Sequence, residues 1–271
     1  MAVNFEFKDR YDFNDLVQIV RILREPGGCP WDMEQTHQSI RENFLEETYE
    51  VIEAINKKDK DLLQEELGDV LLQVVFHAQM EKEAESFDFS DVTDGVCKKL
   101  IERHPHVFGE VKVSGTEEVL SNWDDIKRKS KGQKTQGSSM LKVPKELPAL
   151  MRAQKIQSKA KKAGFDWDDM SGAFEALESE IKELKNAVDT HDSDAIEDEF
   201  GDVLFSCVNI ARFIGVDSEQ SLSRANDKFM SRFLVVEKLA AERDIDMKNT
   251  PIDELDKLWD EAKKILASNR E

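Results

Sequence analysis

Two matching sets of carboxylates are the side chains of this chain best suited to chemistry. In each set a Glu-x-x-Glu pair is followed by a Glu-x-x-Asp pair, and all four acids of the second set follow those of the first at one constant offset. The sets are Glu47, Glu50, Glu66 and Asp69 in the N-terminal half and Glu180, Glu183, Glu199 and Asp202 in the C-terminal half. The chain is therefore an internal duplication.

Helical spacing indicates what these acids can do. Residues three apart share a helix face, so each pair converges, and a short turn between the two expected helices makes them antiparallel neighbours. Carboxylates gathered in this way repel one another by roughly 4 kcal/mol per pair at 4 Å and an effective dielectric of about 20. A cation is needed between them, and an all-oxygen ligand set suits a hard ion such as Mg²⁺ or Mn²⁺.

A pair of basic residues is duplicated as well. Lys99-x-x-x-Arg103 in the first half is repeated by Lys228-x-x-x-Arg232 in the second, at an offset slightly shorter than that of the acids. Side chains one helical turn apart can hold a phosphate between them, and a guanidinium does so with two parallel hydrogen bonds. We therefore expect a phosphate clamp beside each metal site.

The four tryptophans form two pairs, Trp31 with Trp167 and Trp123 with Trp259, which share one offset slightly longer than that of the acids. Trp31 and Trp167 precede the two acidic helices, whereas Trp123 and Trp259 follow the basic pairs. For Trp31, Trp167 and Trp259 we expect packing in the core rather than stacking on a ligand.

The elements that position these residues are predicted to be helices. The chain has 12 glycines, 6 prolines and 35 % charged residues, and few alternating β-branched runs, which favours an all-α fold. The helix over residues 62–84 is densely apolar and should be central in its bundle. A short helix should carry Trp123 and Ile126. The other expected helices span residues 13–23, 41–55, 90–103, 148–162, 171–188, 193–214, 218–242 and 251–267.

The duplication predicts two tandem homologous helical domains, residues 1–128 and 147–271, joined by a linker over residues 129–146. A chain of 271 residues is long enough for each domain to bury a core of its own. Residues 129–139 lack any large apolar side chain, as is typical of a linker.

Composition excludes several classes of function. The net charge of −19 argues against a nucleic-acid groove, which needs a basic footprint, although bound divalent cations still permit a nucleotide ligand. Cys29, Cys97 and Cys207 are isolated, which fits a reducing cytoplasm and no disulfide framework. The charged N-terminus has no signal-peptide pattern, and no stretch approaches the roughly 20 apolar residues of a membrane span. We expect a cytoplasmic protein without membrane partners.

Other interpretations of the acids have less support. Exposed Glu-x-x-Glu pairs are common on solvated helices, but the recurrence of four acids, a basic pair and two tryptophans in register argues against that interpretation. A dinuclear iron bundle needs two Glu-x-x-His units, and the chain has one, Glu34-x-x-His37, away from the acids. A Walker-type glycine loop is absent.

Taken together, these motifs resemble the MazG family of all-α nucleoside triphosphate pyrophosphohydrolases. Beyond the acids and the basic pair, four further segments resemble the long, two-repeat bacterial members, so that the resemblance covers nearly the whole chain. They are Cys29-Pro30-Trp31-Asp32, Arg103-His104-Pro105-His106-Val107-Phe108, Leu150-Met151-Arg152-Ala153-Gln154-Lys155-Ile156 and Gly164-Phe165-Asp166-Trp167.

The resemblance implies hydrolysis of NTPs or dNTPs to the monophosphate and pyrophosphate with Mg²⁺, and homodimers in which helices pair into four-helix bundles. An activated water would attack the α-phosphorus, with a carboxylate as base. In the C-terminal repeat the resemblance assigns the metal to four acids, the triphosphate to the basic pair and the nucleobase to a tryptophan. These residues are Glu180, Glu183, Glu199, Asp202, Lys228, Arg232 and Trp259, with Asp202 also near the substrate and Glu180 and Glu199 as equal candidates for the catalytic base.

The same roles fall in the N-terminal repeat to Glu47, Glu50, Glu66, Asp69, Lys99, Arg103 and Trp123. In two-repeat members the family usually assigns hydrolysis to the C-terminal repeat, yet here Ser179 stands where the pattern begins with Glu46 in the N-terminal repeat. Which repeat is catalytic therefore stays open. A non-catalytic, nucleotide-sensing helical scaffold is the alternative to a pyrophosphohydrolase that serves in nucleotide-pool housecleaning or regulation.

Overall fold

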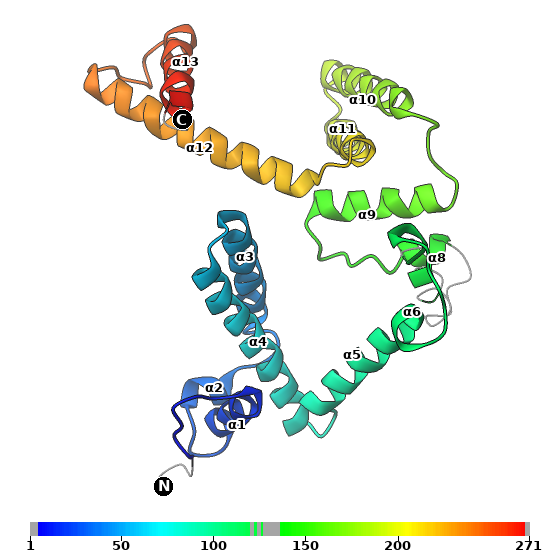
Figure 1. Ribbon diagram of the computed structural model, residues 1–271. Helices are drawn as coiled ribbons and strands as arrows, with labels where there is room; N and C mark the ends of the chain where they lie inside the picture. Colours follow the sequence, from blue (N-terminus) through cyan, green and yellow to red (C-terminus); the bar gives the residue numbers. More distant parts are fainter. Residues whose placement is uncertain (1–4, 120–121, 124–125, 127–135, 269–271) are drawn as a thin grey trace. The chain divides into compact units, whose positions relative to one another are not determined.

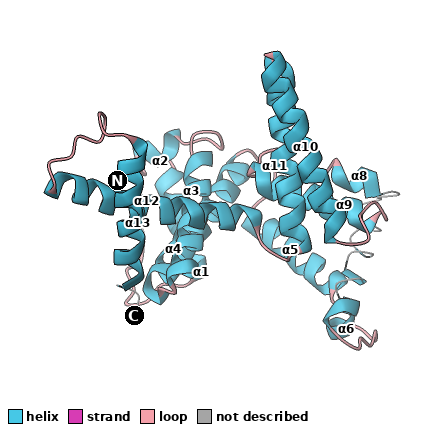
Figure 2. Cartoon of the chain, turned by 90° about the horizontal axis from the view of Figure 1, so that it is seen from above, coloured by secondary structure: helices cyan, strands magenta, loops and turns pink. Residues whose placement is uncertain are grey.

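The computed structural model describes residues 5–119, 122, 123, 126 and 136–268. Every regular element among these residues is a helix and none is a strand (Figure 2), which confirms the all-α prediction. Within the same residues no helix combines the length and the apolar content that a membrane crossing requires. Cys29, Cys97 and Cys207 are free thiols.

The chain divides into two compact units, Met1–Lys127 and Arg128–Glu271. Residues 129–135 of the predicted linker lie outside the described residues. Its next part is structured: α8 (Gln136–Met140) contacts α9 (Ala149–Lys162), and Val143 is buried. The domain limits 1–128 and 147–271 stay a prediction.

In the first unit, four predicted helices are found within a few residues of the expected bounds. They are α1 (Phe13–Arg24), α3 (Arg41–Lys57), α4 (Lys60–Glu83) and α5 (Phe89–Arg103). Two short helices, α2 (Pro30–Glu34) and α6 (Pro105–Phe108), were not predicted. The predicted central place of α4 is confirmed, because α1, α3 and α5 all contact it (Figure 1). Its C-terminal half forms the core with α1, where Val20, Val75 and Phe76 are buried.

The second unit repeats this plan, again close to the expected ranges. They are α9, α10 (Met170–Thr190), α11 (Ser193–Phe213), α12 (Ser218–Glu242) and α13 (Ile252–Ser268). The α10–α11 pair is in extensive contact, and α9 packs on α11. A separate apolar cluster joins α12 to α13 through Val236, Leu239 and Leu258.

The same turn joins the two helices of each acidic hairpin. Lys58 and His191 adopt the left-handed conformation, with φ of 56° and 57°, and end α3 and α10. The next residue, Asp59 or Asp192, caps the following helix by accepting hydrogen bonds from backbone amides in its first turn. A turn this short makes α3–α4 and α10–α11 antiparallel neighbours (Figure 1).

Large apolar side chains remain exposed along both hairpins. On α3 and α4 they include Leu45, Ile55 and Leu67, at 57, 56 and 52 % exposure, and on α11 they include Phe200, at 54 %. A soluble chain seldom leaves such rows uncovered, so these faces are suited to association.

The predicted burial of Trp31 and Trp167 is wrong for a single chain, since their exposures are 60 and 46 %. Trp31 lies at the start of the short α2. The Trp167 ring lies directly over Gly172 in the first turn of α10.

Candidate metal and nucleotide site

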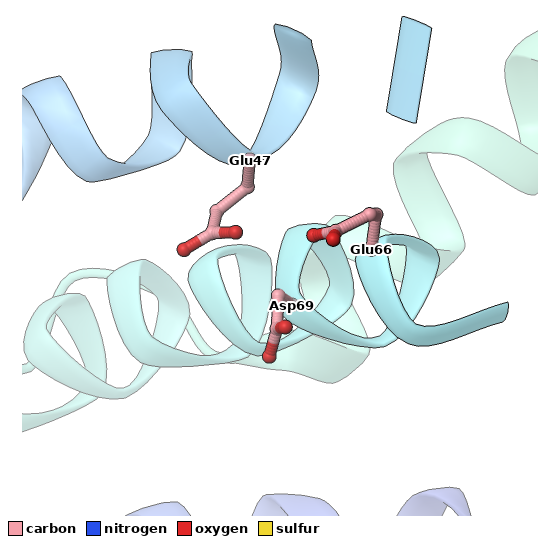
Figure 3. Close-up of side chains that lie close together, drawn as sticks. All are labelled: Glu47, Glu66 and Asp69. Atoms are coloured by element: carbon pink, nitrogen blue, oxygen red, sulfur yellow. The ribbon is translucent and has the colours of Figure 1, made fainter. Parts of the chain in front are cut away.

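The acids of the first hairpin converge as the spacing predicts. Glu47 projects from α3 toward Glu66 and Asp69 on α4 (Figure 3), and one carboxylate oxygen of each lies within 4.8 Å of the other two. Glu66 is buried, at 8 % exposure, while the other two are half-buried. We call these three residues the N-terminal acidic cluster.

The electrostatics of this cluster call for a cation. Partial burial, then the charges of Asp69 and Glu50, raise the pKa of Glu47 above its ordinary value. Burial, then the charge of Glu50, raises the pKa of Glu66. Glu50, the fourth predicted acid, thus lies close enough to act on both. A bound divalent ion would reverse these penalties by stabilising the ionised carboxylates.

The second hairpin holds an equivalent C-terminal acidic cluster. Carboxylate oxygens of Glu180 on α10 and of Glu199 and Asp202 on α11 lie within 4.8 Å of one another. Burial is again the largest cause that raises the pKa of Glu180 and of Glu199, and the charge of Glu183 is the next. Asp202 is exposed, so this cluster is more open to solvent than the N-terminal one.

The repeats differ in what contacts the fourth acid, Glu183 or Glu50. Ser179 stands where the N-terminal repeat has Glu46, and its hydroxyl donates a hydrogen bond of 2.9 Å to Glu183 Oε1. In the N-terminal repeat the matching Glu50 instead approaches Glu47 and Glu66 closely enough for a side-chain hydrogen bond to raise both pKa values. The i, i+4 spacing of Ser179 and Glu183 is a sequence signal for this contact, one that motif reasoning missed.

The basic pairs do not lie beside the acids of the same hairpin. About 21 Å of α4 separates Asp69 from the helix end at Glu83, and α5 then leads away from α4 to Arg103 at its own C-terminus (Figure 1). In the second unit about 16 Å of α11 follows Asp202, and α12 carries Lys228 and Arg232 away from the α10–α11 hairpin. Within the described part of each unit, the helices therefore do not bring the basic pair to the acids of the same hairpin.

The arginine of each basic pair stacks instead on the tryptophan that follows it. The Cζ atom of Arg103 lies 6.0 Å from the ring centroid of Trp123, and that of Arg232 lies 5.7 Å from the ring centroid of Trp259. Trp259 also packs against the apolar cluster of α12 and α13, so its expected core contact is confirmed. Sequence reasoning matched these residues between the repeats but did not foresee that they pair.

A histidine contact in the first unit was also missed. His37 and His77 Nδ1 atoms lie 2.7 Å apart, and His37 Nε2 lies 2.9 Å from a carboxylate oxygen of Glu81. Burial and the nearby His37 lower the pKa of His77. These contacts join the segment before α3 to the C-terminal half of α4, away from the acidic cluster.

Both clusters have the donor set of a hard-cation site. Carboxylate oxygens suit Mg²⁺, Mn²⁺ or Ca²⁺, and the described part of the chain brings neither thiolate nor imidazole into either group. The fold and the site thus define a class: an all-α protein with two tandem helical hairpins, each lined by carboxylates suited to a divalent cation.

Comparison with known proteins places this class within one family. Residues 35–108 and 171–234 match the family model described as the MazG nucleotide pyrophosphohydrolase domain. The chain is 45 % identical over 251 residues to the "Nucleoside triphosphate pyrophosphohydrolase/pyrophosphatase MazG" of Thermotoga maritima, covering 93 % of this chain and 95 % of that protein. It is 43 % identical over 254 residues to the "Nucleoside triphosphate pyrophosphohydrolase" of Escherichia coli (strain K12), covering 92 and 96 %.

A Bacillus subtilis protein named "Uncharacterized protein YabN" is 46 % identical over 259 residues, which is 93 % of this chain and 52 % of that protein. The first matched segment contains the α3–α4 hairpin with α5 and α6, and the second contains the α10–α11 hairpin, except Met170, and α12 as far as residue 234. The chain belongs to the MazG family.

Proposed function

We propose that this protein hydrolyses nucleoside triphosphates to nucleoside monophosphates and pyrophosphate with a divalent cation, Mg²⁺ or Mn²⁺. The observation that carries the proposal is the acidic cluster that recurs in both repeats, with three carboxylates in mutual reach. Its support is the family itself, because the two relatives covered almost end to end are named nucleoside triphosphate pyrophosphohydrolases.

The residue roles follow from the site. In the C-terminal repeat Glu180, Glu183, Glu199 and Asp202 would hold the cation, as Glu47, Glu50, Glu66 and Asp69 would in the N-terminal repeat. The bound cation supplies water activation and offsets charge on the phosphates. One carboxylate would then take the proton of the attacking water, with Glu180 and Glu199 as equal candidates.

A second copy of the chain completes the site in this proposal. Each acidic hairpin leaves a row of apolar side chains exposed, and each basic pair lies on a helix that leads away from its own acids. Pairing the exposed faces in a homodimer would cover the apolar rows and bring a partner's helices to each hairpin. The nucleotide would then bind between acids of one chain and basic residues of the other.

The test is a product analysis of the full chain with MgCl₂ and each of the eight common NTPs and dNTPs. Anion-exchange chromatography should show the monophosphate and pyrophosphate in equal amounts, and EDTA should abolish both. A variant with Asp69→Asn and Asp202→Asn together serves as the matched control, since it alters one ligand in each cluster. Release of diphosphate and orthophosphate, or binding without turnover as in a nucleotide sensor, would refute the proposal.

A further inference from the structure

The stacking of an arginine on a tryptophan recurs in both repeats although the two residues are differently spaced in sequence. Fewer residues separate Arg103 from Trp123 than separate Arg232 from Trp259, yet the guanidinium lies 6.0 and 5.7 Å from the indole centroid. Both distances fall within the range of a cation–π contact. The arginine–tryptophan contact is thus present in both repeats although the intervening segment differs in length, which indicates that the contact itself has a role.

The indole of Trp259 is a firm support for this contact. Trp259 packs against the buried cluster of Val236, Leu258 and their neighbours, which fixes its plane between α12 and α13. Phe229, one turn before Arg232, lies on the same ring with centroids 5.1 Å apart. The guanidinium therefore rests on a ring that its own helix and the next helix hold in place.

The donors of the two arginines stay available for a ligand. Within the described residues, neither Arg103 nor Arg232 forms a hydrogen bond or an ion pair with a carboxylate; the Nε of Arg103 is buried without an acceptor, so its terminal N–H groups are the donors that can reach a ligand. Stacking occupies the flat face of a guanidinium and leaves the terminal N–H donors at its edge free to bind an anion bidentately. A flat, held guanidinium also loses less side-chain entropy when it binds.

We propose that the tryptophan of each repeat, Trp259 and Trp123, is a positioning residue for the arginine that binds the triphosphate. The indole holds the guanidinium of Arg232 or Arg103 flat, with its donor edge turned to the phosphates, so the tryptophan contributes to phosphate binding whatever it contributes to the nucleobase. This proposal rests on the proposed function for the identity of the ligand. It makes a distinct claim, because a tryptophan that contacts the nucleobase alone has no effect on a ligand without one.

Inorganic tripolyphosphate is a ligand that has the phosphates and lacks a nucleobase. Its dissociation constant is measured by isothermal titration calorimetry on the full chain at fixed free Mg²⁺, with each change made in both repeats at once so that the result does not depend on which repeat is occupied. The parent should bind it. Replacing both arginines by Ala should weaken binding by about 10- to 150-fold, and replacing both tryptophans by Leu by about two- to fivefold.

Coupling distinguishes positioning from general packing. Adding Trp→Leu to the Arg→Ala protein should cause no further loss, and Trp→Phe in both repeats, which keeps a π face, should restore most of the affinity. Phe229→Leu is the control for the C-terminal repeat and is compared with Trp259→Leu made alone, since it removes an aromatic neighbour of Trp259 and leaves Arg232 in place; it should bind like the parent. Circular dichroism melts confirm that each variant is folded.

The proposal is overturned if tripolyphosphate does not bind, if Trp→Leu leaves its affinity unchanged, if the two losses add, or if Phe229→Leu weakens binding as much as Trp259→Leu made alone does. Failure of the proposed function is seen separately, as the absence of monophosphate and pyrophosphate in the product assay. Calorimetry measures tripolyphosphate binding whether or not the protein hydrolyses nucleotides, because it needs no turnover.

Discussion

The repulsion inside the N-terminal acidic cluster can be measured by removing one charge, with Glu47→Gln. One carboxylate oxygen of each of Glu47, Glu66 and Asp69 lies within 4.8 Å of the other two. At that distance two unit charges repel by about 0.9 kcal/mol at a dielectric of 80 and by about 3.5 kcal/mol at a dielectric of 20. Because Glu47 and Asp69 are half-buried, solvent screening favours the lower part of that range, about 1–2 kcal/mol. Glu47→Gln keeps the shape of the side chain and should stabilise the metal-free protein by this amount.

The assay is thermal unfolding in EDTA and in Mg²⁺. For a unit of this size, about 1–2 kcal/mol corresponds to a rise in Tm of about 4 to 8 °C in EDTA. Saturating Mg²⁺ should raise the Tm of the parent by more than that of the variant, since the variant has lost a ligand. Glu46→Gln is the matched control: Glu46 is the exposed neighbour of Glu47, and its change should stay within about 0.5 kcal/mol.

A Glu47→Gln protein that melts at or below the parent in EDTA would refute this reasoning. It would mean that the three carboxylates are not forced together in solution, or that water between them screens the charges fully. An equal gain from Glu46→Gln would refute it as well, since the effect would then come from the overall negative charge of α3.

Three further outcomes follow from the two clusters. The four clustered glutamates have folded-state pKa values above the ordinary 4.5, so above that pH these groups bind more protons in the folded than in the unfolded chain, and they should stabilise the metal-free protein as pH falls from neutral toward 4.5. His77, whose pKa is lowered, acts in the opposite sense below 6.5, so the glutamate contribution is taken as the part of the pH dependence of thermal melts that Mg²⁺ removes. In initial-rate assays Glu183→Ala and Asp202→Ala should abolish most NTP hydrolysis while Glu50→Ala and Asp69→Ala leave a substantial part; the opposite pattern assigns catalysis to the N-terminal repeat. Ser179→Ala should raise the Mg²⁺ concentration for half-maximal rate by about two- to twelvefold, because Glu183 loses its hydroxyl donor. Ser179→Thr keeps a hydroxyl and should not raise it. Equal values for the parent and Ser179→Ala would contradict a role of the Ser179 hydroxyl in metal binding.

The acidic hairpins could be predicted from the sequence because their geometry is local. Three-residue spacing on two adjacent helices, with a turn too short for any other connection, leaves little freedom for Glu47, Glu66 and Asp69. The helix caps Asp59 and Asp192, which were not predicted, are equally local. For the acids the chain needs no information about distant contacts, and the predicted and observed positions agree.

The rest of the site could not be predicted, because it depends on directions that no local pattern encodes. Lys228 and Arg232 were correctly placed one turn apart, but the angle at which α12 leaves α11 decides whether they meet the acids. The Arg232–Trp259 contact depends on how α12 packs against α13. Trp31 and Trp167 show a third reason, since an aromatic residue in a short helix or a loop is buried only if another element covers it.

The turn between the two helices of each hairpin is preserved in length and not in side-chain type. Lys58 and His191 have different side chains and share one backbone conformation. A single inserted residue would rotate the following helix by about 100° and turn Glu66 or Glu199 away from its partners. The offset between the repeats is constant throughout the acidic hairpins, whereas it is shorter at the basic pairs and longer at the tryptophans. Insertions and deletions since the duplication are thus found outside the hairpins, and those outer segments, rather than Lys58–Asp59 or His191–Asp192, are where the chain can be lengthened without moving its acids.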